Sequence, residues 1–561
     1  MNHFTLFSPP LFHYLTLPEE EATVLVRFLD LLAGSGVFDL MSSEPDSGIG
    51  RPGFDPCRLL AMVLFAFADN GGTLRDMEAR CKYDCRYNFL AGGMPDHSTL
   101  SVFINEKIKP QAEAIFSLIT KAIFRECGLD CDIAHVDGTK QHAFPNKYKF
   151  VWNPIDKHLK LTDKFAKACE SAGLESCVFP GAPIKSAAVA ECLSALSGRL
   201  RASGIDPAAI YRAKGHRLSA DEKRFLEFSA ILGKCLEYEE QERICGDRNS
   251  YYKTDHDATA MCLKEDYYSG LGSNMHAAYS VLAFVSHGLV ASYYVSQDRS
   301  DFTAFPKALE KHREMFGSYP KKVSGDAGFG NLTNYELLDF LGIEAYVKYN
   351  DWEGESSGAR PPMYHYGEDG EIYCLNGRRC AKTEIQGRHP KAKGAYLYVV
   401  TGCTGCQFMP WCRRYQTAKE GDEKTFEINP RYLMLKEAAK ARLLSPEGIE
   451  IRVNRSCQVE GAYGQMKWNM GYDRIRRVGI EGVSMEVMLN FLGSNLRKFF
   501  RFVRGENPFG YWKAPPGTKP GEFKKPSAKR LATKAAKFGH GKKQPNEIAR
   551  DSYRRKRKRR R

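Results

Sequence analysis

The stretch DIAHVDGTK, residues 132–140, combines the pattern of a buried strand with a single carboxylate. Ile133, Ala134 and Val136 are apolar, and Asp137 follows them directly before a Gly-Thr pair that predicts a turn. A carboxylate at the end of a strand can cap a turn, bind a metal ion or act as a base. The stretch alone leaves these three roles of Asp137 open.

A second apolar stretch, KKVSGDAGFG (321–330), also delivers a carboxylate, Asp326, to a predicted strand end. Two further runs, joined by a His-Gly turn at 287–288, predict a hairpin, and helices are expected over 302–316 and 331–342. This order predicts an α/β fold in which a mixed sheet is flanked by helices. In such sheets ligands gather at strand ends, which is where both aspartates are expected.

Helical patterns fill two other regions. Residues 1–130 contain short helices with Asp55 as one N-cap and a Thr73–Asp76 capping pattern at another. This N-terminal domain fits a helix-turn-helix-like DNA-binding or dimerisation module, and it equally fits a small helical bundle. The stretch of about 155–250 is rich in Ala, Leu, Lys and Glu, and it predicts a helical insertion without a motif that assigns a role.

A cysteine-containing region interrupts the α/β pattern at about 351–450. Its spacing includes Cys374 and then Cys403-x2-Cys406-x5-Cys412. Four thiolates from these positions are one way to build a tetrahedral structural zinc site. Reduced structural cysteines are the alternative, because only one Cys-x2-Cys pair is present. The chain has 17 cysteines in total and no pattern typical of export, so a reducing compartment is expected.

The formal net charge of +15 is concentrated at the C-terminal end of the sequence. Residues 514–561 hold 18 Lys or Arg against three acids, so this tail carries the whole excess and the rest of the chain is balanced. With few apolar residues, the segment 506–561 is predicted to be a disordered basic tail. Such a tail binds phosphate backbones with strong salt dependence; a solubilising or localisation role is the alternative. No secretion signal or membrane span is expected.

A late helix supplies a third carboxylate. Glu460 and Lys467 lie seven residues apart in NRSCQVEGAYGQMKW (454–468), on one helical face. Three hard carboxylates, Asp137, Asp326 and Glu460, match the ligand set for two Mg²⁺ ions about 3.5–4 Å apart, which is the equipment for in-line phosphoryl transfer. Each acid alone fits a turn or a solvated helix face equally well.

Several longer motifs in the same order resemble a known family. They are RPGFDPCRLLAMVLFAFADNGGTLRDMEARC (51–81), FLAGGMPDHSTLSVF (89–103), HVDGTKQHAFPNKYKFVW (135–152), VSGDAGFGNLTNYELL (323–338) and QVEGAYGQMKWNMGYDRIRRVGIEGVSMEVMLNFLGSNLRKF (458–499). Over residues 20–500 the chain resembles a DDE transposase of bacterial insertion sequences. The resemblance implies a ribonuclease-H-like core, an insertion between the second Asp and the Glu, and Asp137, Asp326 and Glu460 as metal ligands for two Mg²⁺ or Mn²⁺ ions.

This resemblance orders the chain into five parts. They are a helical N-terminal domain with DNA binding as one of its expected roles (1–130), the first part of the catalytic core with its helical insertion (131–350), the cysteine-containing insertion subdomain (351–450), the end of the core with the Glu helix (451–505), and the basic tail (506–561).

Related transposases carry a Tyr, an Arg and a Lys around the Glu. Lys467 fits the Lys position and is predicted to bind DNA phosphate. The Arg position holds Ser456 and the Tyr position holds Val453, so neighbouring Arg455 is predicted to substitute for the Arg. Trp152 and Trp468 fit either base stacking or core packing, and core packing is favoured.

Two more acids lie in SQDRSDF (296–302). Asp298 and Asp301 are expected either to support the metal ligands or, for Asp301, to cap a helix.

The function implied is that of an insertion-sequence transposase. It would bind double-stranded DNA at the terminal inverted repeats, expose a 3′-hydroxyl by hydrolysis and join it to target DNA, as a homodimer on paired ends in the cytoplasm, associated with the nucleoid. The alternatives are a metal-dependent endonuclease without strand transfer, and a non-catalytic DNA-binding protein derived from a transposase.

Overall fold

The computed structural model describes residues 17–41, 53–69, 73–175, 178–179, 181–211, 218–263, 274–386, 394–414 and 421–523. The chain divides into two compact units, one made of 1–142, 262–274 and 279–561, the other of 143–261 and 275–278. The fold is mixed α/β and about 53% helical, with a mixed sheet flanked by helices, as the sequence predicted. No helix in the described ranges is long and apolar enough to span a membrane.

The central sheet runs in the order β6-β5-β1-β7-β8. Short β4 pairs with the first residues of β5, and these paired residues are counted in the second unit. The strands are β1 (Ile133–His142), β4 (Thr259–Met261), β5 (His276–Ser286), β6 (Leu289–Ser296), β7 (Lys322–Gly330) and β8 (Glu344–Tyr349). β1, β7 and β8 are parallel, while β5 and β6 form the predicted hairpin. Its turn uses positive φ at His287 (51°) and Gly288 (73°), which suits a tight two-residue connection.

β1 is longer than the sequence indicated. Residues 138–139 were expected to form a turn, but the strand continues to His142. The side-chain amide of Gln141 donates a hydrogen bond to the carbonyl oxygen of Tyr472 (2.8 Å). The backbone N–H of Ile475 donates to the carbonyl oxygen of His142 (2.8 Å). A distant segment therefore provides partners that keep residues 138–142 extended, and Asp137 lies within the strand rather than at its end.

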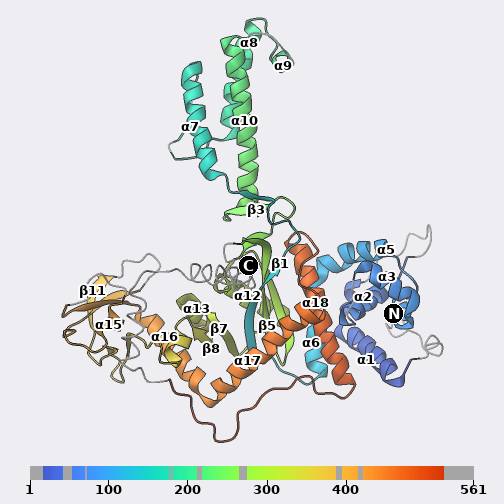
Figure 1. Ribbon diagram of the computed structural model, residues 1–561. Coiled ribbons are helices and arrows are strands. Elements are labelled where there is room, and N and C mark those ends of the chain that lie inside the picture. Colours follow the sequence, from blue (N-terminus) through green and yellow to red (C-terminus); the bar gives the residue numbers. More distant parts are fainter. Residues whose placement is uncertain are drawn as a thin grey trace, which may run out of the picture. The chain divides into compact units, whose positions relative to one another are not determined.

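Helices cover the sheet on both sides (Figure 1). They are α12 (Asp301–Phe316), α13 (Leu332–Phe340), α16 (Pro430–Leu444), α17 (Pro446–Gly464) and α18 (Ile480–Val503). α12 packs on β6 and β7, α16 on β8, and α18 on β6, while α17 contacts β1, β7, β6 and β8. The core between these layers includes Val136, Leu282, Phe305 and Ile451. Burial on both faces explains why the strands read as nearly continuous apolar runs.

The N-terminal region is helical, as expected. Its helices are α1 (Glu19–Ser35), α2 (Pro56–Ala68), α3 (Leu74–Tyr83), α4 (Cys85–Ala91), α5 (His97–Phe103) and α6 (Ala112–Glu126), with short turns η3 (Val37–Met41), η4 (Ile104–Ile108) and η5 (Lys109–Gln111). Asp55 caps α2, and Thr73 and Asp76 form the predicted capping box of α3. α18 packs closely on α2 at Gly493, where a side chain would not fit. A Cβ at this position would lie only 2.6 Å from the carbonyl oxygen of Phe67.

The second unit is built mainly from helices. It contains α7 (Ile155–Ala172), α8 (Ser186–Ala202), α9 (Pro207–Ile210) and α10 (Ala220–Cys245), together with strands β2 (Phe150–Trp152) and β3 (Ser250–Tyr252). An apolar core of its own joins these helices and includes Phe165, Leu196, Phe228 and Ile231. α10 begins with a capping box between Ser219 and Glu222.

Two small sheets occupy the cysteine-containing region. The elements are α14 (Trp352–Ser356), β9 (Tyr364–Tyr366), β10 (Ile372–Cys374), β11 (Ala381–Gln386), β12 (Tyr396–Val400), α15 (Met409–Cys412) and β13 (Lys424–Ile428). β9 pairs with β10, and β11, β12 and β13 form a three-stranded antiparallel sheet. A separate cluster of buried side chains, including Ile372, Tyr398 and Phe426, joins the two sheets.

Residues 506–523, which the sequence assigned to the basic tail, make defined contacts with the core. Trp512 and Asn454 exchange two hydrogen bonds of 2.8 Å. Phe523 packs edge-on against Trp352, with ring centroids 5.0 Å apart. The aromatic residues of this segment explain its attachment, since they remove apolar surface from water. The rest of the predicted tail, 524–561, lies outside the described residues.

Candidate active site

Asp137 and Asp326 lie on neighbouring parallel strands at matching positions. In the register of β1 with β7, His135 pairs with Ser324, and their side chains are 2.6 Å apart at Nδ1 and Oγ. Because side chains two residues apart share a face of a strand, Asp137 and Asp326 both follow on that face. Burial first, and then the charge of Asp326, raise the pKa of Asp137 to about 6. The structure thus brings together two of the three predicted carboxylates.

A further carboxylate, Asp301, joins this pair from the start of α12. A Cβ at Gly138 would lie 2.6 Å from Cγ of Asp301, so only glycine leaves room for the carboxyl group there. Ser280 donates a hydrogen bond of 3.0 Å to Asp301 Oδ1. Burial raises the pKa of Asp301, with a contribution from the charge of Asp326.

The two acids of 296–302 have separate positions. The helix-cap interpretation of Asp301 is wrong, because Ser300 is the N-cap of α12 and no side chain caps the helix. Asp298 instead accepts a hydrogen bond of 2.9 Å from Ser296. Of these two acids, Asp301 is therefore the one placed against β1.

Arg455 lies against the first aspartate. Its Nη1 is 3.5 Å from Oδ2 of Asp137, and both side chains are largely buried. The positive charge lowers the pKa of Asp137, in opposition to burial and to Asp326. The sequence selected Arg455 only as a substitute phosphate ligand; in the structure it is the ion-pair partner of a predicted metal ligand.

Tyr463 connects the Glu-bearing helix to the same strand. Its hydroxyl lies 2.9 Å from the carbonyl oxygen of Asp137 and 3.1 Å from that of Val281, and donates to both. Burial raises the pKa of Tyr463 well above its ordinary value, so the hydroxyl keeps the proton it donates. The family pattern pointed to Val453 and missed this tyrosine. The available signal was its spacing of three residues after Glu460.

Lys467 reaches the strand just beyond Asp137. It lies in η6 (Gln465–Asn469), a π-helical turn that continues α17, and its Nζ donates to Thr139 Oγ1 at 2.7 Å and to the carbonyl oxygen of Lys140 at 3.3 Å. Single π turns often occur where a helix carries functional side chains.

Glu460 lies between these contacts in sequence and is exposed. Tyr463 and Lys467, at three and seven residues later, share its face of the helix. In the described part of the chain, no group of three His, Cys, Asp or Glu side chains is arranged closely enough to hold a metal ion. The structure therefore places the face that carries Glu460 beside β1, without closing a three-carboxylate ligand set.

Both tryptophans are exposed, so the favoured core-packing interpretation is wrong. Trp152 is 60% exposed and Trp468 is 78% exposed. Trp152 ends β2 and contacts Phe150, with ring centroids 5.3 Å apart. Trp468 directly follows Lys467 in η6. Exposed large aromatic side chains are available for stacking against bases.

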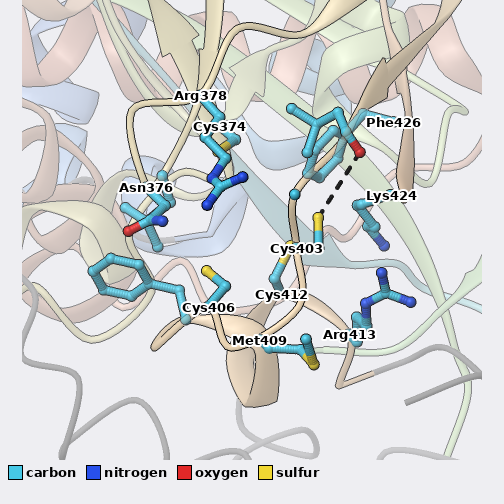
Figure 2. Close-up of a pocket in the computed structure, with 14 residues that line it drawn as sticks. Cys374, Asn376, Arg378, Cys403, Cys406, Met409, Cys412, Arg413, Lys424 and Phe426 are labelled. Carbon is cyan, nitrogen blue, oxygen red and sulfur yellow. Dashed lines mark hydrogen bonds between the residues drawn. The ribbon is translucent and has the colours of Figure 1, made fainter. Parts of the chain in front are cut away.

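The four predicted zinc ligands come together around one small cavity. Cys374, Cys403, Cys406 and Cys412 all line it (Figure 2). Cys380 does not line it; like Cys374, it is part of the core between the small sheets.

The fold and the acidic cluster define a mixed α/β protein with carboxylates on adjacent strands of its central sheet. The family model of the transposase DDE domain matches residues 373–500, which include the cysteine cavity, Glu460 and most of α18. The family model of a transposase domain of the DUF772 type matches residues 13–106, which include α1 to α5. These matches support a DDE transposase of insertion-sequence type. Neither the curated proteins nor the solved structures contain a match.

Proposed function

We propose that this protein is the transposase of an insertion sequence. It binds the transposon ends, hydrolyses one strand to expose a 3′-hydroxyl, and uses that hydroxyl to attack target DNA. The observation that carries the proposal is the proximity of Asp137 and Asp326 on two adjacent parallel strands, with the helix that bears Glu460 joined to the first strand by Tyr463. Two matches to transposase domains support it, one over residues 13–106 and one over residues 373–500, which contain Glu460.

The proposal of divalent metal ions of the Mg²⁺ or Mn²⁺ type rests on the oxygen donors of these acids, since the described residues do not hold three of them close enough for a metal ion. Asp137, Asp326 and Asp301 lie near one another, and burial first, with a further contribution from the charge of Asp326, raises the pKa of Asp137 and of Asp301. Such a group is stabilised by a hard cation with oxygen ligands. Asp137, Asp326 and Glu460 are the residues that would hold two ions. Bound ions supply a polarised oxygen nucleophile and neutralise charge on the phosphate.

The protein's own cations complete the site. Arg455 and Lys467 flank the acids on the α17 side, and both are in reach of residues 137–140. Their charges would hold the phosphate beside the scissile bond and orient it for in-line attack. No covalent protein–DNA intermediate is required, because positioning and charge neutralisation serve both the hydrolysis and the joining step.

We further infer that the central sheet is the ribonuclease-H-like core that the family resemblance implies, and that about 351–450 is its insertion. The partners are double-stranded DNA at the inverted repeats and at the target. Two ends must be held together for joining, so a homodimer is the active form. We infer that the N-terminal helices and the basic residues beyond 523 bind DNA, and that the protein acts in the cytoplasm, associated with the nucleoid.

The experiment that tests this function uses a plasmid that carries the flanking inverted repeats, purified protein and Mg²⁺. Products in which a 3′ end is joined to target DNA identify a transposase. Cut ends without joined products identify the endonuclease alternative. DNA binding without any cleavage identifies the non-catalytic alternative, in which the three acids and the arginine at and beside β1 have no chemical use.

A further inference from the structure

Four cysteines from three separate segments surround one small cavity. Cys374 ends β10, Cys403 and Cys406 lie in the turn after β12, and Cys412 ends α15. The cavity is about 30 Å³, which accommodates one water-sized body. Figure 2 shows the four side chains around this space, with Lys424 and Arg413 beside Cys403 and Cys412. The convergence is a product of folding, since 28 residues separate Cys374 from Cys403 in the chain.

The Cys-x2-Cys turn is held in a fixed shape. The backbone N–H of Cys406 donates to the carbonyl oxygen of Cys403 at 3.1 Å, and Gly405 has a φ of +70°, which a side chain disfavours. Asp422 accepts hydrogen bonds from the N–H of Gly402 at 3.0 Å and from the hydroxyl of Thr404 at 2.9 Å. These bonds present both thiols of the turn to the cavity from one rigid loop.

Two buried cations face the thiols. Lys424 is 7% exposed and Arg413 is 5% exposed, and both line the cavity. Arg413 donates to the carbonyl oxygens of Gly421 (2.8 Å) and Glu423 (2.6 Å). Lys424 has no ion pair with a carboxylate of the described residues; its neighbours are the Phe426 ring, at 5.3 Å, and the thiols of Cys412 and Cys403. Lysine is rarely buried without a counter-charge, because desolvating the ammonium group is costly.

We propose that Cys374, Cys403, Cys406 and Cys412 bind one Zn²⁺ ion as four thiolates. On binding, four S–H bonds break, four Zn–S bonds form and four protons leave to solvent. The resulting centre carries two negative charges, and Lys424 and Arg413 supply two positive charges next to it. Among the described residues, the four cysteine side chains are not close enough together to coordinate a metal ion. Zinc binding would therefore move the four sulfur atoms toward the centre of the cavity.

The role of this zinc is structural. A two-stranded and a three-stranded sheet share a small core, which gives little apolar burial to hold them together. Four protein ligands leave no open position for water or substrate, which is the arrangement of structural zinc. The ion would join β10, the Cys-x2-Cys turn and α15.

The test is the zinc content of the full-length protein purified under reducing conditions. About one zinc per chain is expected in the wild type. Cys403→Ser and Cys406→Ser should each lose most of it. Cys85→Ser, an exposed cysteine of α4, and Cys380→Ala, beside the cavity but not lining it, should keep it. A wild-type protein without zinc, serine variants that keep it, or a Cys380→Ala variant that loses it would overturn the assignment.

Two further measurements test the zinc site without depending on the folding of a serine variant. Cys403→His keeps a ligand of the type zinc accepts, so it should retain about one zinc per chain. After cobalt replacement, its sulfur-to-metal absorption should be weaker than that of the wild type, because one thiolate is lost. Capping the thiols of the folded wild type with a mercurial should release the zinc. If apo wild type shows no sulfur-to-cobalt absorption, or if capping releases no zinc, the proposal is wrong.

Discussion

The hydroxyl of Tyr463 donates a hydrogen bond of 2.9 Å to the carbonyl oxygen of Asp137. This contact joins residues 326 positions apart and fixes α17 on β1. Glu460 is one helical turn before Tyr463, so the contact also sets the position of the third predicted carboxylate relative to the first. The position of Glu460 in the proposed active site therefore depends on a buried tyrosine.

Replacing this tyrosine tests that dependence. Tyr463→Phe leaves the carbonyl groups of Asp137 and Val281 without their shared donor, which should lower the free energy of unfolding by about 1–3 kcal/mol. It should also reduce DNA cleavage about tenfold or more, because a small displacement of a catalytic group is costly. Urea unfolding and a cleavage assay measure the two effects.

Tyr335→Phe is the matched control for this variant. Tyr335 is also buried and donates a hydrogen bond of 2.8 Å, to the carbonyl oxygen of Val347, but it lies on α13. It should lose similar stability while cleavage, measured where both variants remain folded, stays near the wild-type rate. Equal losses of cleavage in the two variants would show that Tyr463 acts only through stability.

The raised pKa of Asp137 makes the stability of the metal-free protein depend on pH. Burial, then Asp326, shift this pKa from 3.8 to about 6 in the folded state. A raised pKa adds stability that is complete below about pH 3.8 and lost as the pH rises through about 6. Between pH 4 and 6.5 the wild type should lose on the order of 2–3 kcal/mol of unfolding free energy relative to Asp137→Asn. Parallel stability curves, recorded with a chelator present, would refute the shift.

The exposed ring of Trp468 predicts a direct contribution to DNA binding. Trp468→Ala should weaken binding of an inverted-repeat end by about 10- to 100-fold, since one stacked base is worth about 1–3 kcal/mol. The midpoint of thermal unfolding should not change, because the ring is 78% exposed. Phe340→Ala, which removes an 86% exposed ring from α13, is the control and should bind DNA normally. Normal binding by Trp468→Ala would remove this residue from the interface.

The contacts of residues 506–523 define where the basic tail should be truncated. A chain ending at Phe523 keeps the packing of Phe523 on Trp352 and removes 17 Lys or Arg and two acids. It should bind DNA more weakly, with a shallower dependence of log affinity on log salt concentration. Catalysis on saturating DNA should remain. An unchanged salt slope would show that the tail does not contact phosphates.

Local sequence patterns correctly predicted the helix caps and the hairpin turn, which are determined by residues close together in the chain. Asp55 and the Thr73–Asp76 pair cap the helices as expected, and the hairpin turn at His287 and Gly288 forms. The strand patterns around Asp137 and Asp326 also pointed to acids that the sheet brings together. These features depend on neighbours within a few residues or on the regular alternation of a strand.

What the sequence missed depends on distant partners. β1 continues past Gly138 because residues 472–475 pair with its end. Tyr463 and Asp301 acquire their roles only when α17 and α12 pack beside β1. Trp468 was expected inside the core, and it is exposed because the π turn that carries it follows the packed part of α17. Apart from the spacing of Tyr463 three residues after Glu460, these outcomes have no signature in the residues nearby.

The most direct test of the central claim measures metal-dependent cleavage and joining of inverted-repeat DNA by Asp137→Asn, Asp326→Asn and Glu460→Gln. Each variant should bind the DNA ends with wild-type affinity and lose at least about 1000-fold in both reactions, because two-ion positioning needs all three carboxylates. Glu481→Gln, an exposed acid of α18, should act as the wild type does. Undiminished cleavage and joining by any one of the three variants would contradict the account.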